Sequence, residues 1–264
     1  MLSKHLHHEI HRCSNPDASW VLMVHGAGGS TRTWRKQVDE FGKHYHLLII
    51  DLPGHAGSAE STRHTDRYNF EWISMRIWDV VDLYTDRPIH LVAVSLGSII
   101  AMQMYELRPK GIAALLFAGP IVSLNVKLRL LARSGLFIAR IIGFRNFYSL
   151  MAKIVLPRKN HKKSREIFVR ESKFLSLEEY RKWTAMYGHY LDQTLKKLFS
   201  FQPHIPMLIL VGGQDHLFLK PTLQYANRFQ TISLEVVQRC GHLVSLEKSE
   251  VFNQACLAFM KKIN

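Results

Sequence analysis

Ser95 lies where a serine side chain could act as a nucleophile. Residues 89–94 form an apolar run, Ser95 follows them, and a helical pattern starts at Leu96. The residues two before and two after the serine, Ala93 and Gly97, are small. This spacing is typical of a nucleophile elbow, a sharp strand-to-helix turn that exposes a serine hydroxyl above the edge of a sheet. The usual pattern has glycine in place of Ala93, and the alternative role for Ser95 is to cap the helix that follows.

A serine hydroxyl becomes a good nucleophile only when a base removes its proton. His242 is the candidate base because an imidazole titrates near neutral pH, and Asp215 is the candidate acid that would orient the imidazole. Each follows an apolar run that ends a few residues earlier, at 211 and at 237. Taken alone, His242 could be an ordinary loop histidine and Asp215 a turn aspartate. Together with Ser95, they predict attack on an acyl carbonyl.

A glycine-rich turn over residues 25–29 follows another apolar run, 20–24. Attack on a carbonyl creates an oxyanion, which preorganised backbone N–H groups can stabilise. We expect one donor to be the N–H of Leu96 and the other to be that of Ala27, with Gly28 as the alternative. Gly26 and Gly28 are predicted substrate-binding positions, because glycine lets the backbone approach a ligand closely. His25 and His216 are expected to be structural, as are Trp34, Trp72 and Trp78.

Strands and helices alternate along most of the chain, which predicts a parallel sheet covered by helices on both faces. Ser95, Asp215 and His242 then lie just past the carboxyl ends of strands, where ligands collect in open α/β sheets. The segment 121–200 breaks the alternation with helical patterns only. The predicted strands are 5–12, 20–24, 46–50, 89–94, 112–117, 206–211 and 233–237, and the predicted helices are 33–42, 70–85, 96–107, 219–229 and 248–262.

Five motifs carry a family resemblance: HGAGG at 25–29, DLPGHAGS at 51–58, AVSLG at 93–97, GGQDH at 212–216 and CGHL at 240–243. With the order serine, acid, histidine, the chain resembles the α/β-hydrolases, in particular small lid-bearing esterases and C–C hydrolase-like enzymes. In some of these relatives the acid follows the preceding strand. Residues 117–121 contain no acid here, which favours Asp215.

The resemblance implies an α/β-hydrolase fold with a mostly parallel central sheet and helices on both faces. It also implies a helical lid at 121–200 inserted into a core formed by 1–120 and 201–264. A lid closes the pocket and excludes water. The short N-terminal segment leaves open whether the antiparallel first strand usual in the family is present.

Positive charge is concentrated in the middle of the chain. Residues 126–200 hold 17 Lys or Arg and 5 Asp or Glu, whereas the whole chain carries a net charge of +14. This charge is either a solvated surface or a face for something anionic, which is either a membrane surface or an acidic substrate. No nucleic-acid motif accompanies it, so we expect no nucleic-acid partner.

Other sequence features limit the possible classes of protein. The first residues include no apolar stretch typical of a signal peptide, and the three cysteines have no paired spacing, which predicts a cytoplasmic protein. No phosphate-binding loop, dinucleotide fingerprint or metal-ligand spacing is present, so we expect no cofactor and no metal. Histidines 5, 7, 8 and 11 fit an exposed strand face better than a metal site.

The sequence therefore predicts a serine hydrolase that cleaves a small or medium carboxylic ester or thioester through an acyl-enzyme. The expected partner is a small-molecule acyl substrate. Acyl transfer or C–C bond hydrolysis on the same triad remains an alternative. A third possibility is a ligand-binding or peripheral membrane protein with slow turnover, whose basic lid touches an anionic membrane.

Overall fold

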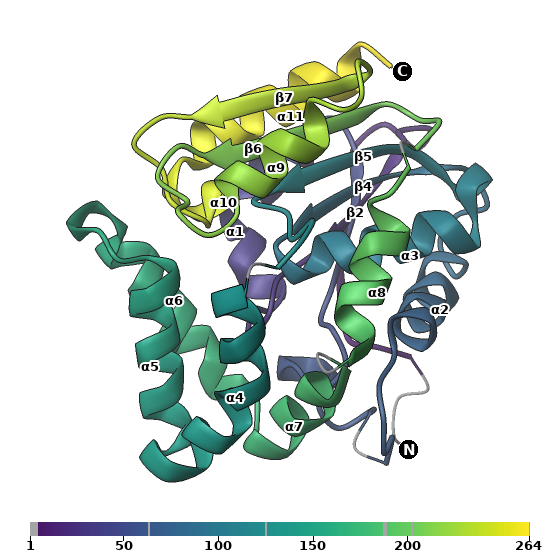
Figure 1. The fold of residues 1–264 in the computed structure, drawn as a ribbon. Coiled ribbons are helices and arrows are strands. Elements are labelled where there is room, and N and C mark those ends of the chain that lie inside the picture. The colour runs from purple at the N-terminus through teal and green to yellow at the C-terminus, as the bar shows by residue number, and fades with distance from the viewer. Residues whose placement is uncertain (1–4, 63, 125, 187–188, 202, 264) are drawn as a thin grey trace.

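The computed structural model describes residues 5–62, 64–124, 126–186, 189–201 and 203–263. Within these residues, seven strands form one sheet in the order β1-β3-β2-β4-β5-β6-β7 (Figure 1). Neighbouring strands are parallel except β1, which runs antiparallel to β3. The strands are β1 (His8–His11), β2 (Trp20–Val24), β3 (His46–Ile50), β4 (Ile89–Val94), β5 (Ile112–Ala118), β6 (Met207–Gly212) and β7 (Ile232–Val237).

The predicted mostly parallel sheet with helices on both faces is confirmed. Strands β2, β3 and β4 have the predicted bounds because each is a short apolar run that is buried on both faces. The antiparallel first strand, left open by the sequence, is present. It is shorter than the predicted 5–12, and its residues are only half-buried, as is usual at a sheet edge.

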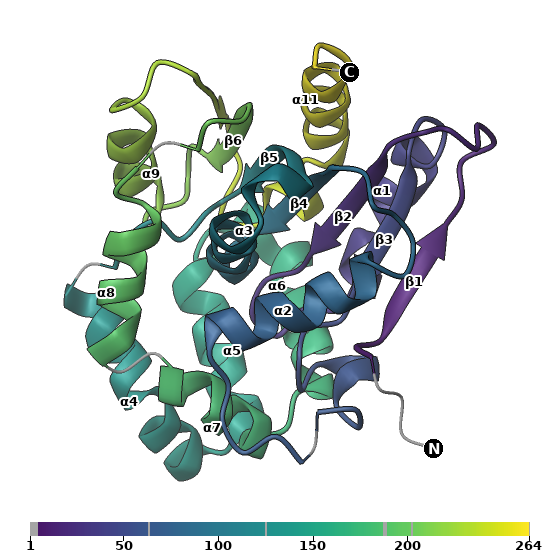
Figure 2. The same cartoon turned by 90° about the vertical axis from the view of Figure 1, so that its right-hand side faces the viewer.

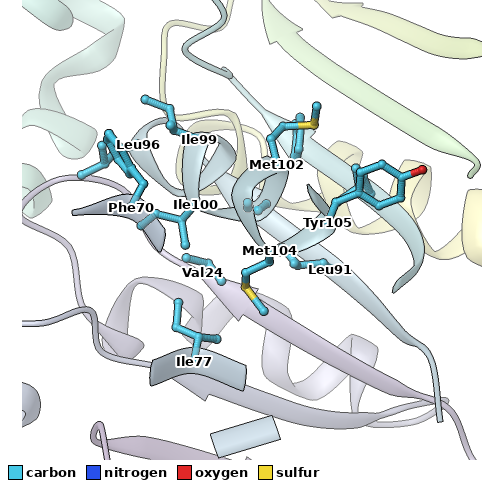
Figure 3. Packing of buried hydrophobic residues seen from close by; sticks show 14 of the residues in the cluster. Val24, Phe70, Ile77, Leu91, Leu96, Ile99, Ile100, Met102, Met104 and Tyr105 are labelled. Carbon is cyan, nitrogen blue, oxygen red and sulfur yellow. The ribbon is translucent and has the colours of Figure 1, made fainter. Parts of the chain in front are cut away.

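Alternate residues of each strand point to opposite faces of the sheet and build two cores. One core takes Val24 and Leu91 from the strands and packs them against α2 (Phe70–Val81) and α3 (Leu96–Leu107), as Figure 3 shows. Helix α9 (Leu219–Ala226) joins this face.

The second core takes the other strand residues, such as Met23 and Val92, and buries Phe41 and Phe252 against them. These two side chains come from α1 (Arg35–Phe41) and α11 (Ser249–Lys261), which cover this face. The predicted helix 33–42 begins instead with a 3-10 turn over Thr31–Trp34. A short helix, α10 (Val244–Glu247), follows His242 and was not predicted. Figure 2 shows the helices on the two sides of the twisted sheet.

Among the residues that the structure describes, five α-helices lie between β5 and β6, where the strand–helix alternation breaks. We call residues 126–198 the helical insertion. It consists of α4 (Val126–Ile142), α5 (Phe144–Val155), α6 (Lys162–Glu171), α7 (Leu177–Met186) and α8 (His189–Leu198). Helices α4 to α7 gather beyond one end of the sheet (Figure 1), and α8 packs back along α3. A small core of Ala139, Phe147, Tyr148 and Leu175 holds α4 and α5 to the segment after α6.

No described helix is both long enough and apolar enough to cross a membrane.

Candidate active site

Ser95 occupies a strained turn between β4 and α3. Its backbone has φ +53° and ψ −119°, in a region that costs a non-glycine residue on the order of 1–3 kcal/mol. Such strain persists only where the surrounding structure enforces it. Gly97 allows the close approach, because a Cβ there would lie 2.6 Å from the carbonyl oxygen of Val24. Ala93 is fully buried, so the alanine in place of the usual glycine is accommodated.

The side chain of Ser95 meets that of His242. The distance from Ser95 Oγ to His242 Nε2 is 2.9 Å, which is a hydrogen bond from the hydroxyl to an imidazole nitrogen. His242 is 3% exposed, and the ring of Phe218 lies 4.8 Å from its ring, centroid to centroid. Phe218 therefore limits how far the imidazole can rotate. The sequence offered no signal for this contact.

Asp215 holds the other side of the imidazole. His242 Nδ1 donates to Asp215 Oδ2 over 2.7 Å, while Asp215 Oδ1 accepts from the backbone N–H groups of Leu217 (3.2 Å) and Phe218 (3.0 Å). Burial raises the pKa of this carboxyl, but the charge and hydrogen bond of His242 and the two backbone donors together lower it below its usual value. Asp215 is therefore ionised and fixes the tautomer that leaves Nε2 free to accept.

Glu247 supports the loop that carries His242. Its carboxylate accepts from the backbone N–H of Gly241 (2.8 Å) and that of Leu243 (3.3 Å), the two neighbours of the histidine. The side chain is 5% exposed. His161, a fully buried residue between α5 and α6, lies 3.7 Å from Glu247 and 3.0 Å from Gln214. The helical insertion thus contacts both loops that hold the candidate acid and base.

The backbone N–H groups of Ala27 and Leu96 are the candidate oxyanion donors. Ala27 and Leu96 both line the cavity beside Ser95, and neither N–H donates to another group in the part of the chain that the structure describes. The N–H of Gly28 donates to His55 Nε2 over 3.0 Å, so the alternative assignment of Gly28 as oxyanion donor does not fit. Gly26 is close to Ser95, since a Cβ at 26 would lie 3.1 Å from that of the serine.

His25 and His55 fix the glycine-rich turn as neutral side chains. Burial lowers the pKa of His25 to about 4, against a smaller opposing effect of its hydrogen bond to the Gly26 carbonyl. Burial and the nearby His25 lower the pKa of His55 to about 3. His25 Nε2 accepts from the N–H of Leu52. The prediction that His25 is structural fits this geometry. His216 was also predicted to be structural, but its side chain is exposed.

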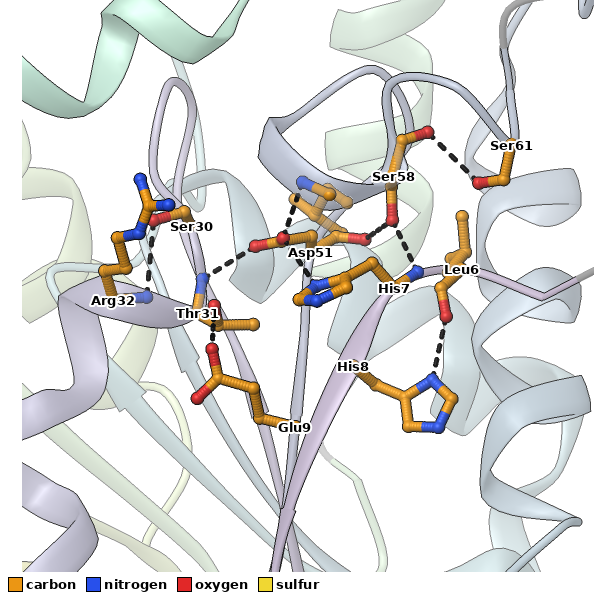
Figure 4. A network of polar contacts seen from close by, with 12 residues as sticks. Leu6, His7, His8, Glu9, Ser30, Thr31, Arg32, Asp51, Ser58 and Ser61 are labelled. Atoms are coloured by element: carbon orange, nitrogen blue, oxygen red, sulfur yellow. Dashed lines mark hydrogen bonds and ion pairs between the residues drawn. The ribbon is translucent and has the colours of Figure 1, made fainter. Parts of the chain in front are cut away.

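Asp51, the first residue of the DLPGHAGS motif, organises the loop beside this turn (Figure 4). Its carboxylate accepts from the backbone N–H of Thr31 (2.7 Å) and that of Gly57 (2.9 Å), and it pairs with His7 Nδ1 (2.8 Å). Asp51 is 1% exposed. These contacts hold the loop in place, and His55 of the same motif lines the cavity beside Ser95, so the motif contributes to the shape of the site.

A cavity of about 220 Å³ extends from Ser95 into the helical insertion. Its lining is mostly apolar. Buried Glu171 also lines it, and its carboxylate accepts from Ser30 Oγ over 2.7 Å. The apolar lining from the insertion includes Leu128, Leu131, Phe147, Met151, Val155, Phe168, Leu175 and Trp183. An apolar cavity of this kind favours a hydrocarbon group on the ligand.

A cluster of buried polar side chains joins helix α7 to the core. Lys182 Nζ lies 2.7 Å from Glu179 Oε1, and the hydroxyl of Tyr68 donates to the other carboxylate oxygen. The side chains of Lys182 and Glu179 are 3% and 9% exposed. Trp183 Nε1 donates to the carbonyl of Pro53 over 3.0 Å. This part of the cavity wall therefore has a fixed position.

The predicted tryptophans behave as core residues. Trp34 and Trp78 are buried, and Trp72 packs against the larger core. Among the residues that the structure describes, no group of three or more His, Cys, Asp or Glu is placed to hold a metal ion.

Comparison with known proteins places this geometry in a family. The model of the alpha/beta hydrolase family matches residues 21–255. An (E)-2-((N-methylformamido)methylene)succinate hydrolase from Acinetobacter baylyi is 24% identical over 91% of this chain and 90% of its own length. A thermophilic esterase from Thermogutta terrifontis superimposes with a TM-score of 0.78 at 20% identity, covering 98% of this chain and 93% of the esterase.

A longer relative also matches. The dihydrolipoyllysine-residue acetyltransferase component of an acetoin cleaving system from Pseudomonas putida is 22% identical over 92% of this chain, which spans 63% of that protein's length. The family match covers most of the chain, and the hydrolase relative that the chain matches over 90% of that protein's length supports a hydrolase. The chain belongs to the alpha/beta hydrolase family.

Proposed function

We propose that this protein is a serine hydrolase that cleaves a carboxylic ester or thioester through a Ser95–His242–Asp215 triad. The observation that carries the proposal is the unbroken chain from Ser95 Oγ to His242 (2.9 Å) and from His242 to Asp215 (2.7 Å). A hydroxyl, a base and an orienting acid in hydrogen-bond contact make an activated nucleophile.

The reaction begins when His242 Nε2 takes the proton of Ser95 Oγ, which attacks the acyl carbon. The carbonyl oxygen becomes an oxyanion, and the N–H groups of Ala27 and Leu96 stabilise it. As the tetrahedral intermediate collapses, the bond to the leaving group breaks, and His242 Nε2–H protonates the departing alkoxide or thiolate. Ser95 now carries the acyl group as an ester. Asp215 stabilises the imidazolium at each stage.

Water completes the cycle. His242 Nε2 takes a proton from a water molecule, and the hydroxide attacks the acyl-enzyme to form a second tetrahedral intermediate. Ser95 Oγ leaves, regains its proton from His242, and the carboxylic acid is released. The helical insertion acts as a lid in this proposal, because it supplies much of the apolar wall around Ser95 and keeps bulk water from the intermediate. The acyl group binds against this apolar wall.

Acyl transfer is the second candidate. It uses the same acyl-enzyme with an alcohol or thiol in place of water. The similarity of 92% of this chain to the acetyltransferase component from Pseudomonas putida favours acyl transfer. Product analysis separates the two, because hydrolysis gives only the free acid and transfer gives a new ester or thioester.

The three described cysteines are free and buried, which supports a reducing, cytoplasmic location.

A fluorophosphonate probe tests the proposal. The native protein should gain one adduct, located on Ser95 by peptide mass spectrometry, and should hydrolyse members of a panel of p-nitrophenyl esters and acyl-CoAs. Ser95→Ala should lose both properties while keeping its circular dichroism spectrum. If the native protein takes no label and hydrolyses nothing in the panel, the proposal is wrong, and a ligand-binding protein with slow or no turnover becomes the better account.

A further inference from the structure

Helix α4 carries large apolar side chains on the outside of the molecule. Val126, Leu130, Phe137 and Ile141 are 67%, 61%, 67% and 67% exposed. Their spacing of four, seven and four residues places them on one face of the helix. We call these four residues the outer stripe. Soluble proteins expose single apolar side chains freely, but an aligned set of four marks a contact surface.

The outer stripe is not the face that builds the active-site cavity. Leu128 and Leu131 of the same helix line the cavity, and Ala139 is buried in the small core of the insertion. Helix α4 is therefore apolar on two faces, one turned inward and one turned out. In Figure 1 it lies between α5 and α7, and in Figure 2 it lies at the left edge of the molecule. Packing of the insertion accounts for the inner face only.

The charges around the outer stripe indicate what covers it. Residues 126–155, which contain α4 and α5, hold six Lys or Arg and no Asp or Glu. Arg129 and Arg140 lie beside the stripe on the helix and are exposed, as are Arg145 and Lys153 on α5. Arg129 pairs with Asp192. In the described part of the chain, no ion pair neutralises Arg140, Arg145 or Lys153.

We propose that α4 docks this protein reversibly on an anionic phospholipid surface. The outer stripe enters the boundary between headgroups and acyl chains, and the neighbouring cations lie against lipid phosphates. An apolar helix face flanked by cations is the arrangement that interfacial helices use. Each cation near an anionic leaflet strengthens binding by about fivefold, and the effect fades beyond a Debye length of about 8–10 Å. The inner face of the same helix continues to line the active-site cavity while the outer stripe contacts lipid.

Vesicle co-sedimentation tests the docking. The purified full chain should sediment with vesicles of phosphatidylcholine and phosphatidylglycerol at low salt, far less with phosphatidylcholine alone, and several-fold less at high salt. The assay needs no catalysis, so its outcome is independent of the proposed hydrolysis. Absence of binding to the anionic vesicles at low salt would overturn the proposal, and so would equal binding to both vesicle types.

Substitutions show whether the outer stripe is the surface in contact. Phe137→Glu should lower the partition coefficient for anionic vesicles by tenfold or more. The matched control is Met75→Glu on α2, where Met75 is 50% exposed, and it should change the coefficient by twofold or less. Unchanged binding of Phe137→Glu overturns the proposal. Sedimentation velocity tests the other possible occupant of the outer stripe, a second copy of this chain. If the protein is a dimer that Phe137→Glu dissociates, and it binds no vesicles, a second copy covers the stripe.

Discussion

At the scale of single residues, the contacts of Asp215 fix both the orientation and the charge of its carboxylate. It is completely buried, yet its pKa is lowered, because His242 and two backbone N–H groups outweigh the cost of burial. Both oxygens are used, one for the imidazole and one for the N–H groups of Leu217 and Phe218. The side chain can therefore hold only one orientation and one charge state.

Asp215→Asn should lower kcat by roughly 10⁴-fold, as loss of the orienting acid does in serine proteases. The amide preserves the shape of the site but can offer its NH₂ group to Nδ1, which favours the tautomer that places the proton on Nε2. The measurement is kcat on the best ester from the panel, with circular dichroism to show that the variant is folded. A variant with activity within threefold of the native protein would mean that another carboxylate is the acid.

Glu247 is a positioning residue at the same scale. It contacts neither Ser95 nor the imidazole, but it accepts from the backbone on both sides of His242. Glu247→Ala leaves these N–H groups without their acceptor and frees the loop. We expect kcat to fall by about 10–100-fold with KM nearly unchanged, because the histidine is displaced and the acyl pocket is not.

The exposed Glu250 on α11 gives the control for Glu247. Glu250→Ala should retain native kcat. A Glu247→Ala variant that raises KM and leaves kcat unchanged would show that the carboxylate supports substrate binding instead.

At the scale of elements, the fold was predictable where one apolar run makes one buried strand. Residues 20–24, 46–50 and 89–94 are such runs, and their bounds needed no tertiary information. Helix ends were less accurate: α2 ends at Val81, where 70–85 was predicted. The extra residues form a turn over 82–84 that helical periodicity alone does not distinguish from a helix.

The candidate site was predictable in part for a related reason. Ser95, Asp215 and His242 each follow a strand, so their order and spacing along the chain carry the pattern. Glu247 and His161 act through contacts made across the fold, and His161 comes from an insertion whose placement no periodicity defines. Such long-range contacts leave no local signature in the sequence.

Buried Glu179 joins helix α7 to the core, because it accepts a hydrogen bond from Tyr68 while it pairs with Lys182 on its own helix. Removing one partner of a buried pair leaves an uncompensated charge, so Glu179→Ala should lower the free energy of unfolding by about 3–5 kcal/mol. Urea titration measures the change. Glu178→Ala, an exposed neighbour on the same helix, should change stability by less than about 0.5 kcal/mol. If the two variants are equally stable, α7 is held by Trp183 and the apolar contacts, and the ion pair contributes little.

At the scale of the whole molecule, buried ionisable side chains hold the loops at the carboxyl edge of the sheet through hydrogen bonds to the backbone. His25 and His55 serve there as neutral hydrogen-bonding groups, and Asp51 and Asp215 accept from backbone N–H groups. His25 and His55 fix the glycine-rich turn, Asp51 the loop after β3, and Asp215 the loop after β6. The turn beside Ser95 therefore depends on His25 and His55 staying neutral, which makes the folded state sensitive to acid.

The sensitivity to acid follows from the two buried histidines. Both have a folded pKa, about 4 for His25 and about 3 for His55, below the value of about 6.5 expected in the unfolded chain. The unfolded chain therefore binds more protons as the pH falls. Their stabilising effect is complete above about pH 6.5 and is lost progressively down to their folded pKa values. Asp215, whose pKa is lowered from an already acidic value, contributes only below about pH 4.

Between pH 7 and pH 5 these two histidines should together lower the free energy of unfolding by about 3–4 kcal/mol. Urea titrations at pH 7, 6 and 5 measure this loss. His25→Gln should be less stable than the native protein at pH 7 but should lose only about half as much free energy on going to pH 5, since one proton-binding group is gone. The exposed His64 provides the control, and His64→Gln should follow the native curve. A native stability that changes by less than about 1 kcal/mol over this range, or equal losses in native protein and His25→Gln, would show that these imidazoles are not held neutral by burial.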